Sequence, residues 1–512
     1  MPNAVYLSPM DNVVTVTREI PSGGSITWLS DDKEYSITAC QSIPLYHKAA
    51  ASAIPAGAPV YKYGQPIGLA LTNIPAGAHV HTQNLASGPA DTKGPFSSAD
   101  QKLQPAPAPA AASATCRNQH TDSRTVPTFQ GYRRSDGRVG IRNHVLVMAG
   151  SVCSSVAAKK IAERLPDVTY LYNPNGCAQT TADTERTLTI LSGLIANGNV
   201  YGALIVGLGC ETIQEDRYLE AVRRLTDKPV SYIKLQECGG VEATVEEGIR
   251  ILTPMVEAAR ACRREPCPVS DLILGLECGG SDPTSGFSAN TVLGNTSDRI
   301  VDLGGTTILS ETPEAIGAEE LLRQQGRTPR IGQKIYEAVK NNEQMFFDIG
   351  MDVRASNPSP GNKASGITTL EEKSLGCVHK SGTRPFDAIL DYGQPVTTKG
   401  LIFMDTTAYD VASVVAKIAG GAQLVVFTTG MGTPVGCAAA PVIKMTGNQK
   451  TASFLSDLID FDSSASITGQ RSVEELGQDL LDYILRICDG EPVKAEINGA
   501  CDMAINQFAS YC

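Results

Sequence analysis

Short apolar runs broken by Pro-Gly turns make up the first 85 residues of the chain. Residues 54–60 and 74–80 both begin with Ile-Pro-Ala-Gly-Ala, and each Pro-Gly turn leads into a strand-like run. Two copies of a motif are too few for a repeat architecture. The pattern therefore predicts a compact β-rich module over residues 1–85.

The hydrophobic pattern stops between residues 86 and 129. Residues 104–113 read Gln-Pro-Ala-Pro-Ala-Pro-Ala-Ala-Ala-Ser, a composition that cannot bury a core. Such a segment is typical of an extended linker. The β-rich module is therefore expected to be tethered, with its position set by docking onto the rest of the protein.

From residue 130 onward, buried-type strands alternate with helical patterns. The apolar run 144–149 precedes apolar residues spaced three to four apart over 156–165, and Pro254 is expected to kink or interrupt a helix over 241–260. A basic hinge at 262–268 divides the region, which gives α/β domains over 130–265 and 266–512. Alternating strands and helices predict mainly parallel sheets with helices on both faces and ligand sites at the carboxyl ends of the strands.

Composition narrows the function. The 512 residues carry a net charge of −11, which argues against a nucleic-acid partner. The start of the chain lacks a basic, apolar leader, and no apolar run approaches a membrane span. The 14 cysteines form no CxxC pair, so they are expected to be reduced thiols in a cytoplasmic protein.

Residues 357–380 hold the densest set of charged and amide side chains. Pro358, Pro360 and Gly361 predict a turn rather than a helix, and a helix with Thr368 or Thr369 as its N-cap should follow. A turn before a helix N-terminus suits an anionic ligand such as a carboxylate. The alternative is a solvated turn and a charged surface helix, which is equally compatible with the composition.

Glycine-rich loops follow several predicted strands, at 175–179, 207–211, 277–282 and 428–434. Each alone is typical of an ordinary loop between a strand and a helix, but four together favour a site for a polar small molecule. No glycine-rich nucleotide fingerprint is present. Cysteines also lie at these strand ends and could bind a metal or an iron–sulfur cluster; the absence of close spacing favours buried, small apolar roles instead: Cys153, Cys177, Cys210 and Cys278.

Three of the six histidines fall in the β-rich module. His79 and His81 share one face if their segment is a strand, and with His47 they could bind a divalent metal. The alternative is that these histidines lie on the surface and bind no metal.

Taken together, these motifs resemble the altronate/galactarate dehydratase family, whose small N-terminal module is an SAF-type domain. The resemblance covers nearly the whole chain. The residues at 79–81 and 275–278 are more similar to the altronate branch of the family than to the galactarate branch. The motifs that carry it lie at 11–13, 47–48, 63–68 and 79–81 in the module, and at 131–143, 176–179, 207–211, 275–282, 304–314, 357–380 and 427–434 in the core.

The resemblance implies a hydro-lyase that converts a sugar acid to a 2-keto-3-deoxy acid with a divalent metal, iron(II) or manganese(II). It leaves a homodimer as one possible assembly. The catalytic candidates are Lys363, Lys380, Glu311 and Glu314. The candidates for substrate binding are Ser281, Asp282, Asn290, Asn362, Thr428, Thr429, Gly430 and Lys444. The candidate metal ligands are His47, His79 and His81.

Three positions depart from the family pattern: Tyr46 and Ser365 replace glycines, and Met431 replaces an arginine. Loss of that arginine could remove a clamp for a distal carboxylate, or only a brace for its loop. Two other functions remain open. One is a sulfo-lyase acting on a small hydroxy sulfonate such as sulfolactate, although those enzymes usually divide module and core between two chains. The other is a sugar-acid-binding relative without catalysis.

Overall fold

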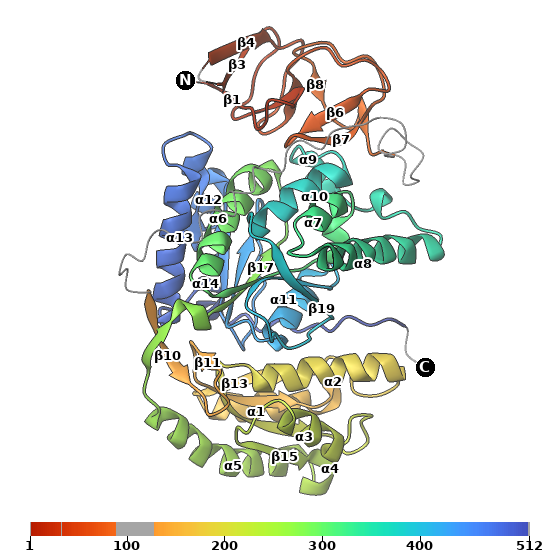
Figure 1. Cartoon of the computed structure of the whole chain (residues 1–512). Helices are drawn as coiled ribbons and strands as arrows, with labels where there is room; N and C mark the ends of the chain where they lie inside the picture. The colour runs from red at the N-terminus through yellow and green to blue at the C-terminus, as the bar shows by residue number, and fades with distance from the viewer. Residues whose placement is uncertain (1, 32, 89–126, 510–512) are drawn as a thin grey trace.

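The computed structural model describes residues 2–31, 33–88 and 127–509. The protein has a small β-rich unit at the N-terminus and two α/β units, as the sequence predicts (Figure 1). The C-terminal unit lies between the other two, with the β-rich unit on one side and the second unit on the other. Most of the linker predicted over 86–129 lies outside the described residues.

The β-rich unit consists of short antiparallel strands. Its sheets have the strand orders β1-β2-β5-β8, β3-β4 and β6-β7-β9. The repeated motif has a structural role, because Ile54 and Ile74 exchange backbone hydrogen bonds of 2.8 Å. The strands are β1 Ala4–Val5, β2 Val13–Val16, β3 Ser25–Ser30, β4 Lys33–Thr38, β5 Lys48–Ala50, β6 Pro59–Lys62, β7 Gln65–Ala70, β8 His79–Val80 and β9 Leu85–Ala86.

The second unit is a parallel four-stranded sheet in the order β13-β12-β14-β15 with helices on both faces. Of the kink or interruption predicted at Pro254, the interruption does not occur, because α5 runs through the proline without a break, although the proline removes one hydrogen-bond donor. The strands are β12 His144–Ala149, β13 Val168–Tyr172, β14 Val200–Gly207 and β15 Val230–Lys234; the helices are α1 Ser155–Arg164, α2 Thr181–Ala196, α3 Glu215–Arg223, α4 Leu235–Cys238 and α5 Val241–Ala261.

The C-terminal unit is a parallel seven-stranded sheet in the order β19-β20-β18-β17-β21-β22-β23. The chain runs outward from β17 in one direction through β18 and later in the other through β21. Strand order therefore reverses between these neighbours, where open α/β sheets form ligand sites. The strands are β17 Ile273–Cys278, β18 Thr306–Leu309, β19 Phe386–Leu390, β20 Gly400–Met404, β21 Leu424–Thr428, β22 Val442–Thr446 and β23 Phe461–Asp462.

The helices of the C-terminal unit cover both faces of its sheet. Helices α6 Asn290–Asp302 and α13 Val473–Cys488 pack together on one face, and α11 Asp410–Ala419 covers β17 on the other. The remaining helices are α7 Glu319–Gln324, α8 Pro329–Asp348, α9 Pro360–Ala364, α10 Leu370–Val378, α12 Gln449–Phe454 and α14 Lys494–Ile497.

Residues 357–380 correct one prediction and confirm another. Residues from Pro360 form α9, where a turn without helix was expected, because proline occupies the first helical position and Ser359 caps the helix. Thr369 caps α10, and its side chain accepts a hydrogen bond from the backbone of Glu372. The first turn of α10 contacts the β-rich unit through Glu372, whereas α9 contacts it at its last residue, through the Ala364 oxygen.

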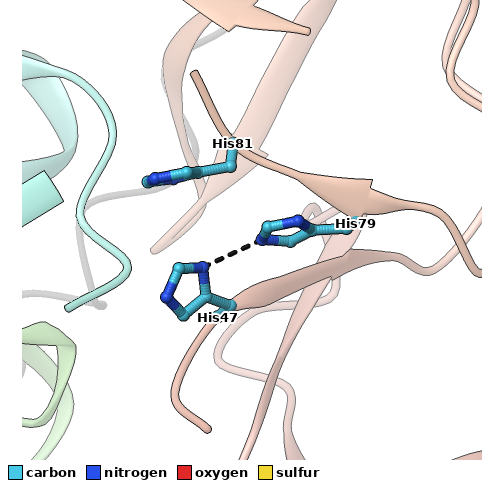
Figure 2. Close-up of side chains that lie close together, drawn as sticks. All are labelled: His47, His79 and His81. Atoms are coloured by element: carbon cyan, nitrogen blue, oxygen red, sulfur yellow. Dashed lines mark hydrogen bonds between the residues drawn. The ribbon is translucent and has the colours of Figure 1, made fainter. Parts of the chain in front are cut away.

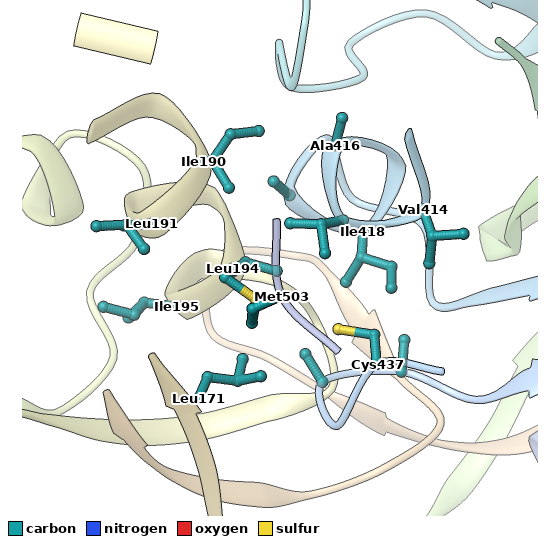
Figure 3. Packing of buried hydrophobic residues seen from close by; sticks show 14 of the residues in the cluster. Leu171, Ile190, Leu191, Leu194, Ile195, Val414, Ala416, Ile418, Cys437 and Met503 are labelled. Carbon is teal, nitrogen blue, oxygen red and sulfur yellow. The ribbon is translucent and has the colours of Figure 1, made fainter. Parts of the chain in front are cut away.

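The second and C-terminal units share one apolar core. Leu191 and Leu194 of α2 belong to the same buried cluster as Val414 and Ile418 of α11, with Met503 of the C-terminal segment between them (Figure 3). Strand β10 (Thr128–Arg133) pairs with β16 (Glu265–Pro268) at the junction and with β11 (Val139–Gly140). These contacts fix the two units relative to each other. In the described parts of the chain, no helix is both long and apolar enough to cross a membrane.

The β-rich unit docks closely over Gly366. This glycine has φ +117°, and a Cβ there would lie 2.9 Å from the Tyr46 oxygen and 3.2 Å from His47. We expect Gly366→Ala to destabilise docking by about 1–3 kcal/mol, because it adds backbone strain and a steric clash. Faster hydrogen–deuterium exchange in β5 would show this. Gly499→Ala, with φ +69° and no neighbour within 4 Å, is the control; an equal effect of both changes would contradict the docking role.

Candidate active site

The three histidines of the β-rich unit converge at its interface with the C-terminal unit (Figure 2). His47 Nδ1 lies 2.9 Å from His79 Nε2, and the ligand atoms of all three side chains lie within 4.8 Å of one another. His47 immediately precedes β5, and His79 begins the neighbouring strand β8. Two contacts with the C-terminal unit hold the group: His47 Nε2 with the Ala364 oxygen and His81 Nδ1 with Thr368 Oγ1.

The electrostatic surroundings keep these imidazoles neutral. Burial, the other two histidines and Lys48 lower the pKa of His79 to about 4. Burial, then Lys48 and His47, lower the pKa of His81 to about 4. Neutral imidazole nitrogens are metal ligands, whereas imidazolium groups are not. The convergence of three neutral imidazoles therefore fits a divalent cation such as iron(II) or manganese(II).

Helix α9 connects the histidines to the sheet of the C-terminal unit. The Asn362 side chain donates a 2.8 Å hydrogen bond to the Ser281 oxygen, just beyond β17. Lys363, on the same short helix, is close enough to His81 to contribute to its lowered pKa. No hydrogen bond or ion pair of the described residues occupies the half-buried Lys363 ammonium. This places a cation beside the imidazoles, where an anionic ligand could bind.

The substrate-binding candidates gather mainly at the carboxyl ends of β17 and β21. Asp282 accepts hydrogen bonds from Thr284, from Ser285 and, at 2.8 Å, from the side-chain amide of Asn448. Asn290 bridges the Thr428 hydroxyl, at 2.6 Å, and a backbone oxygen of α10. Thr429 accepts a hydrogen bond from the Gly432 backbone, and the Gly430 backbone donates to Gly280. The structure thus brings these residues together, but most already hold the loops in place.

A small cavity of about 10 Å³ lies among these elements. Tyr63 of the β-rich unit, Ser281, Asn290, Lys373 and Cys377 contribute to its wall. It is large enough for about one water molecule, so a larger ligand requires some opening between the units. A larger cavity of about 450 Å³ lies near the amino ends of β17 and β18, away from the candidate residues.

The catalytic candidates Lys380 and Glu311 form a buried ion pair behind this cavity. Lys380 Nζ donates to Glu311 at 2.6 Å, to Cys377 Sγ at 2.8 Å and to Cys278 Sγ at 3.1 Å. Burial alone would raise the pKa of Glu311, but Lys380 and Lys417 bring it below its usual value. Glu311 also has φ 67°, an unusual conformation for a residue with a side chain. The pair is enclosed rather than open to a ligand.

The other two candidates have separate surroundings. Glu314 pairs with Lys373 at 2.9 Å, and its Oε2 atom is buried without a hydrogen-bond partner. Since Lys373 lines the cavity, Glu314 is one side chain away from it. Lys444 extends from β22, and burial lowers its pKa to about 8. The Lys444 ammonium contacts a backbone oxygen at 3.3 Å and lies over the Phe427 ring, and within the described residues it bonds none of the other candidates.

Asp410 provides a pH-dependent prediction. Burial, then Glu311 and Glu314, raise its pKa from 3.8 to about 7. The folded protein therefore binds this proton more tightly than the unfolded chain does. As pH rises from about 4 to 7, the Asp410 carboxyl lowers the free energy of unfolding. We therefore expect Asp410→Asn to raise the melting temperature at pH 8 and to have little effect at pH 4. Thermal unfolding at both values measures this, and an equal shift at both would contradict the protonation argument.

The strand-end cysteines differ from expectation. Cys278 is buried, but Cys153, Cys177 and Cys210 are exposed, so the interpretation of all four as buried apolar residues is wrong. The loops that carry these three cysteines, after β12, β13 and β14, hydrogen-bond to one another through their backbones. Within the described ranges, these four thiols do not form a set of ligand atoms within 4.8 Å of one another; Cys278 forms such a set with Glu311 and Cys377 instead.

Family models match each of the three units. The altronate/galactarate dehydratase SAF domain matches residues 2–88, and the D-galactarate dehydratase/altronate hydrolase second domain matches 131–260. The D-galactarate/altronate dehydratase C-terminal model matches 269–510. The chain belongs to the altronate/galactarate dehydratase family.

Relatives of the family match over most of their length. The altronate dehydratase of Bacillus subtilis is 33% identical over 516 residues, covering 99% of both chains. That of Escherichia coli is 34% identical over 512 residues, covering 98% of both. The galactarate dehydratase (L-threo-forming) of Escherichia coli is 30% identical over 470 residues, covering 88% of this chain and 87% of its own. These family members are hydro-lyases, and the chain is an enzyme of this class.

The structure explains one departure from the family pattern and limits another. Tyr46 adopts φ 63°, a conformation that glycine reaches without strain, which accounts for the glycine expected at this position. Ser365 has φ −84°, which any residue can adopt. Met431 is 42% exposed and lies close to Gly361 at the start of α9. Of the three departures, Met431 is thus placed to affect a ligand near α9.

Sequence reasoning missed the group that docks the β-rich unit of this family member. Lys48 and Lys62 both bond the Glu372 carboxylate at 2.8 Å, and the three side chains are buried. Lys48 also donates to the Gly366 oxygen and Thr368. The only sequence signal was a lysine within the apolar β5 segment, which is unusual for a buried strand.

Proposed function

We propose that the protein is a metal-dependent hydro-lyase that converts altronate, or a closely similar six-carbon sugar acid, to a 2-keto-3-deoxy acid. The observation that supports this most is the convergence of three neutral imidazoles with the Lys363 ammonium at the interface of two units. Full-length similarity to two altronate dehydratases supports the substrate class. We expect the protein to act in the cytoplasm, without nucleic-acid or membrane partners; a homodimer is our working hypothesis for its assembly.

His47, His79 and His81 would hold the cation, which supplies a Lewis acid for the substrate carboxylate and a hydroxyl group. The Lys363 ammonium would pair with the carboxylate and position the substrate on α9. Dehydration requires a base for the proton next to the carboxylate and an acid for the departing β-hydroxyl. The Oε2 atom of Glu314 has no hydrogen-bond partner, so it is available for one of these proton transfers. The Lys373 side chain, which pairs with Glu314, would connect it to the substrate. Lys380 and Glu311 would hold the wall of the site in position.

A panel of C3–C6 hydroxy acids, assayed with added iron(II) for 2-keto-acid product, tests the proposal. We expect turnover of altronate in preference to shorter acids. Release of sulfite from sulfolactate, with no keto acid from altronate, would identify a sulfo-lyase instead. Thermal stabilisation by a sugar acid without turnover of any would identify a binding protein.

Substrate preference gives a further prediction at Met431. The Met431 side chain is partly exposed and adjacent to Gly361 and Gly280, near the proposed carboxylate site. We expect Met431→Arg to lower the KM for a six-carbon dicarboxylate about 10-fold relative to altronate, since arginine can bind a distal carboxylate through two hydrogen bonds. Met431→Gln controls for polarity without charge. An equal KM change for both substrates would assign the position to loop stability.

A further inference from the structure

Two thiols form a buried pair directly behind the cavity. Cys278 ends β17, Cys377 lies in the last turn of α10, and their sulfur atoms are 3.5 Å apart. Each residue is 4% exposed. Two elements distant in sequence therefore bring the sulfurs into contact without a covalent bond.

Lys380 joins the pair into one polar group. Its ammonium has three N–H donors, and they go to Cys377, Cys278 and Glu311. The same sulfurs and the Glu311 carboxylate are close enough to bind a metal, but the ammonium already supplies a cation to all three. This arrangement favours chemistry of the sulfur atoms over metal binding.

The two sulfurs differ in their surroundings. Cys278 Sγ lies 3.6 Å from Glu311 Oε1, so its thiol has an acceptor for its proton. The contact with Cys377 and burial raise the pKa of the Cys278 thiol well above its ordinary value. Cys377 receives the shorter contact from Lys380, at 2.8 Å, and contributes to the cavity wall. A small reagent that enters the cavity would meet Cys377 first.

We propose that Cys377 and Cys278 form an oxidative modification site, at which hydrogen peroxide oxidises Cys377 and Cys278 then closes a disulfide. In the first step the Cys377 sulfur attacks one peroxide oxygen, the O–O bond breaks, and the leaving group departs as water with the thiol proton. In the second step the Cys278 sulfur displaces the hydroxyl of the resulting sulfenic acid, which leaves as water with the second thiol proton. The two thiols are oxidised and hydrogen peroxide is reduced to two waters.

The cross-link would change the site on both sides. Closing it draws the sulfurs from 3.5 Å to a bond of about 2.05 Å. It connects the end of β17, directly before the loop with Ser281, to α10, which carries Glu372. We expect reversible loss of turnover, an effect that rests on the proposed function, whereas formation of the bond does not.

Peptide mapping of the full-length protein tests the proposal. Reduced protein is exposed to hydrogen peroxide, blocked with an alkylating reagent, digested and analysed by mass spectrometry. We expect a Cys278–Cys377 cross-linked peptide, reversed by dithiothreitol, and oxidation of Cys377 about 10-fold faster than of the buried Cys437. Absence of the cross-link at peroxide concentrations that oxidise the exposed Cys153 would overturn the proposal.

Single substitutions test the order of the steps. With dimedone present, Cys278→Ser should accumulate an adduct at Cys377, whereas Cys377→Ser should give none at Cys278. An adduct at Cys278, or a linkage from Cys377 to Lys380, would contradict the assignment. Cys437→Ser, a buried thiol in the C-terminal unit, should leave the cross-link intact. The unsubstituted protein gives the principal result if either variant fails to fold, and none of these mass measurements depends on sugar-acid turnover.

Discussion

Replacing His81 by alanine is expected to lower sugar-acid turnover by at least about 100-fold and to remove most of the bound divalent metal. The side chain is one of three imidazoles whose ligand atoms lie within 4.8 Å, and its loss leaves two protein ligands. Because burial and Lys48 keep His81 neutral, its removal takes away a ligand but no charge. The folded state should therefore be little affected.

Metal analysis, activity with added iron(II) and circular dichroism should be measured on the same preparation. Thr82→Ala is the matched control, because it removes an exposed side chain next to His81. Unchanged iron content in His81→Ala would refute the metal site, even if activity fell. Loss of metal with full activity would instead separate the metal from catalysis.

The three-unit architecture could be predicted from the sequence because each unit has its own local pattern. Pro-Gly turns in the first unit and alternating strands and helices in the others are short-range signals. The errors arose where local rules have exceptions that the sequence does not reveal. Pro360 was interpreted as a helix breaker, yet at the first position of α9 its missing N–H costs nothing. Pro254 lies inside α5, where packing of the surrounding helix outweighs its cost.

The candidate site depends on contacts between residues that are far apart in the chain. The histidines could be grouped in advance, because the alternation of a strand places His79 and His81 on one face. Their docking against α9 could not, since His47 and Ala364 belong to units whose relative position follows no local pattern. Lys380 and Glu311 were expected to face a ligand, but their burial and pairing appear only once the ends of β18 and α10 are brought together.

The largest expected effect on stability comes from Glu372→Gln. The Glu372 carboxylate is the shared partner of Lys48 and Lys62, and all three side chains are at most 2% exposed. Glutamine has nearly the same shape but leaves two buried ammonium groups without a counter-charge. Breaking a buried pair in this way costs about 3–5 kcal/mol. The lost ion pairs connect the β-rich unit to the C-terminal unit, so this contact should weaken. The three histidines, which lie at the same contact, should then lose their fixed position as well.

Hydrogen–deuterium exchange should show faster exchange in β5 and α10, while the interior strands β17 and β21 remain protected. Glu337→Gln makes the same chemical change on the exposed face of α8 and should have little effect.

Acid should reproduce part of the effect in the unsubstituted protein. Burial opposes ionisation of Glu372, but Lys48 and Lys62 lower its pKa from 4.5 to about 2. Since the folded value lies below the ordinary one, the stabilisation is complete above about pH 4.5 and is lost as pH falls toward 2. The stability difference between the unsubstituted protein and Glu372→Gln should therefore shrink over this interval. A difference that is constant from pH 7 to pH 2 would show that the docking of the β-rich unit does not depend on this charge.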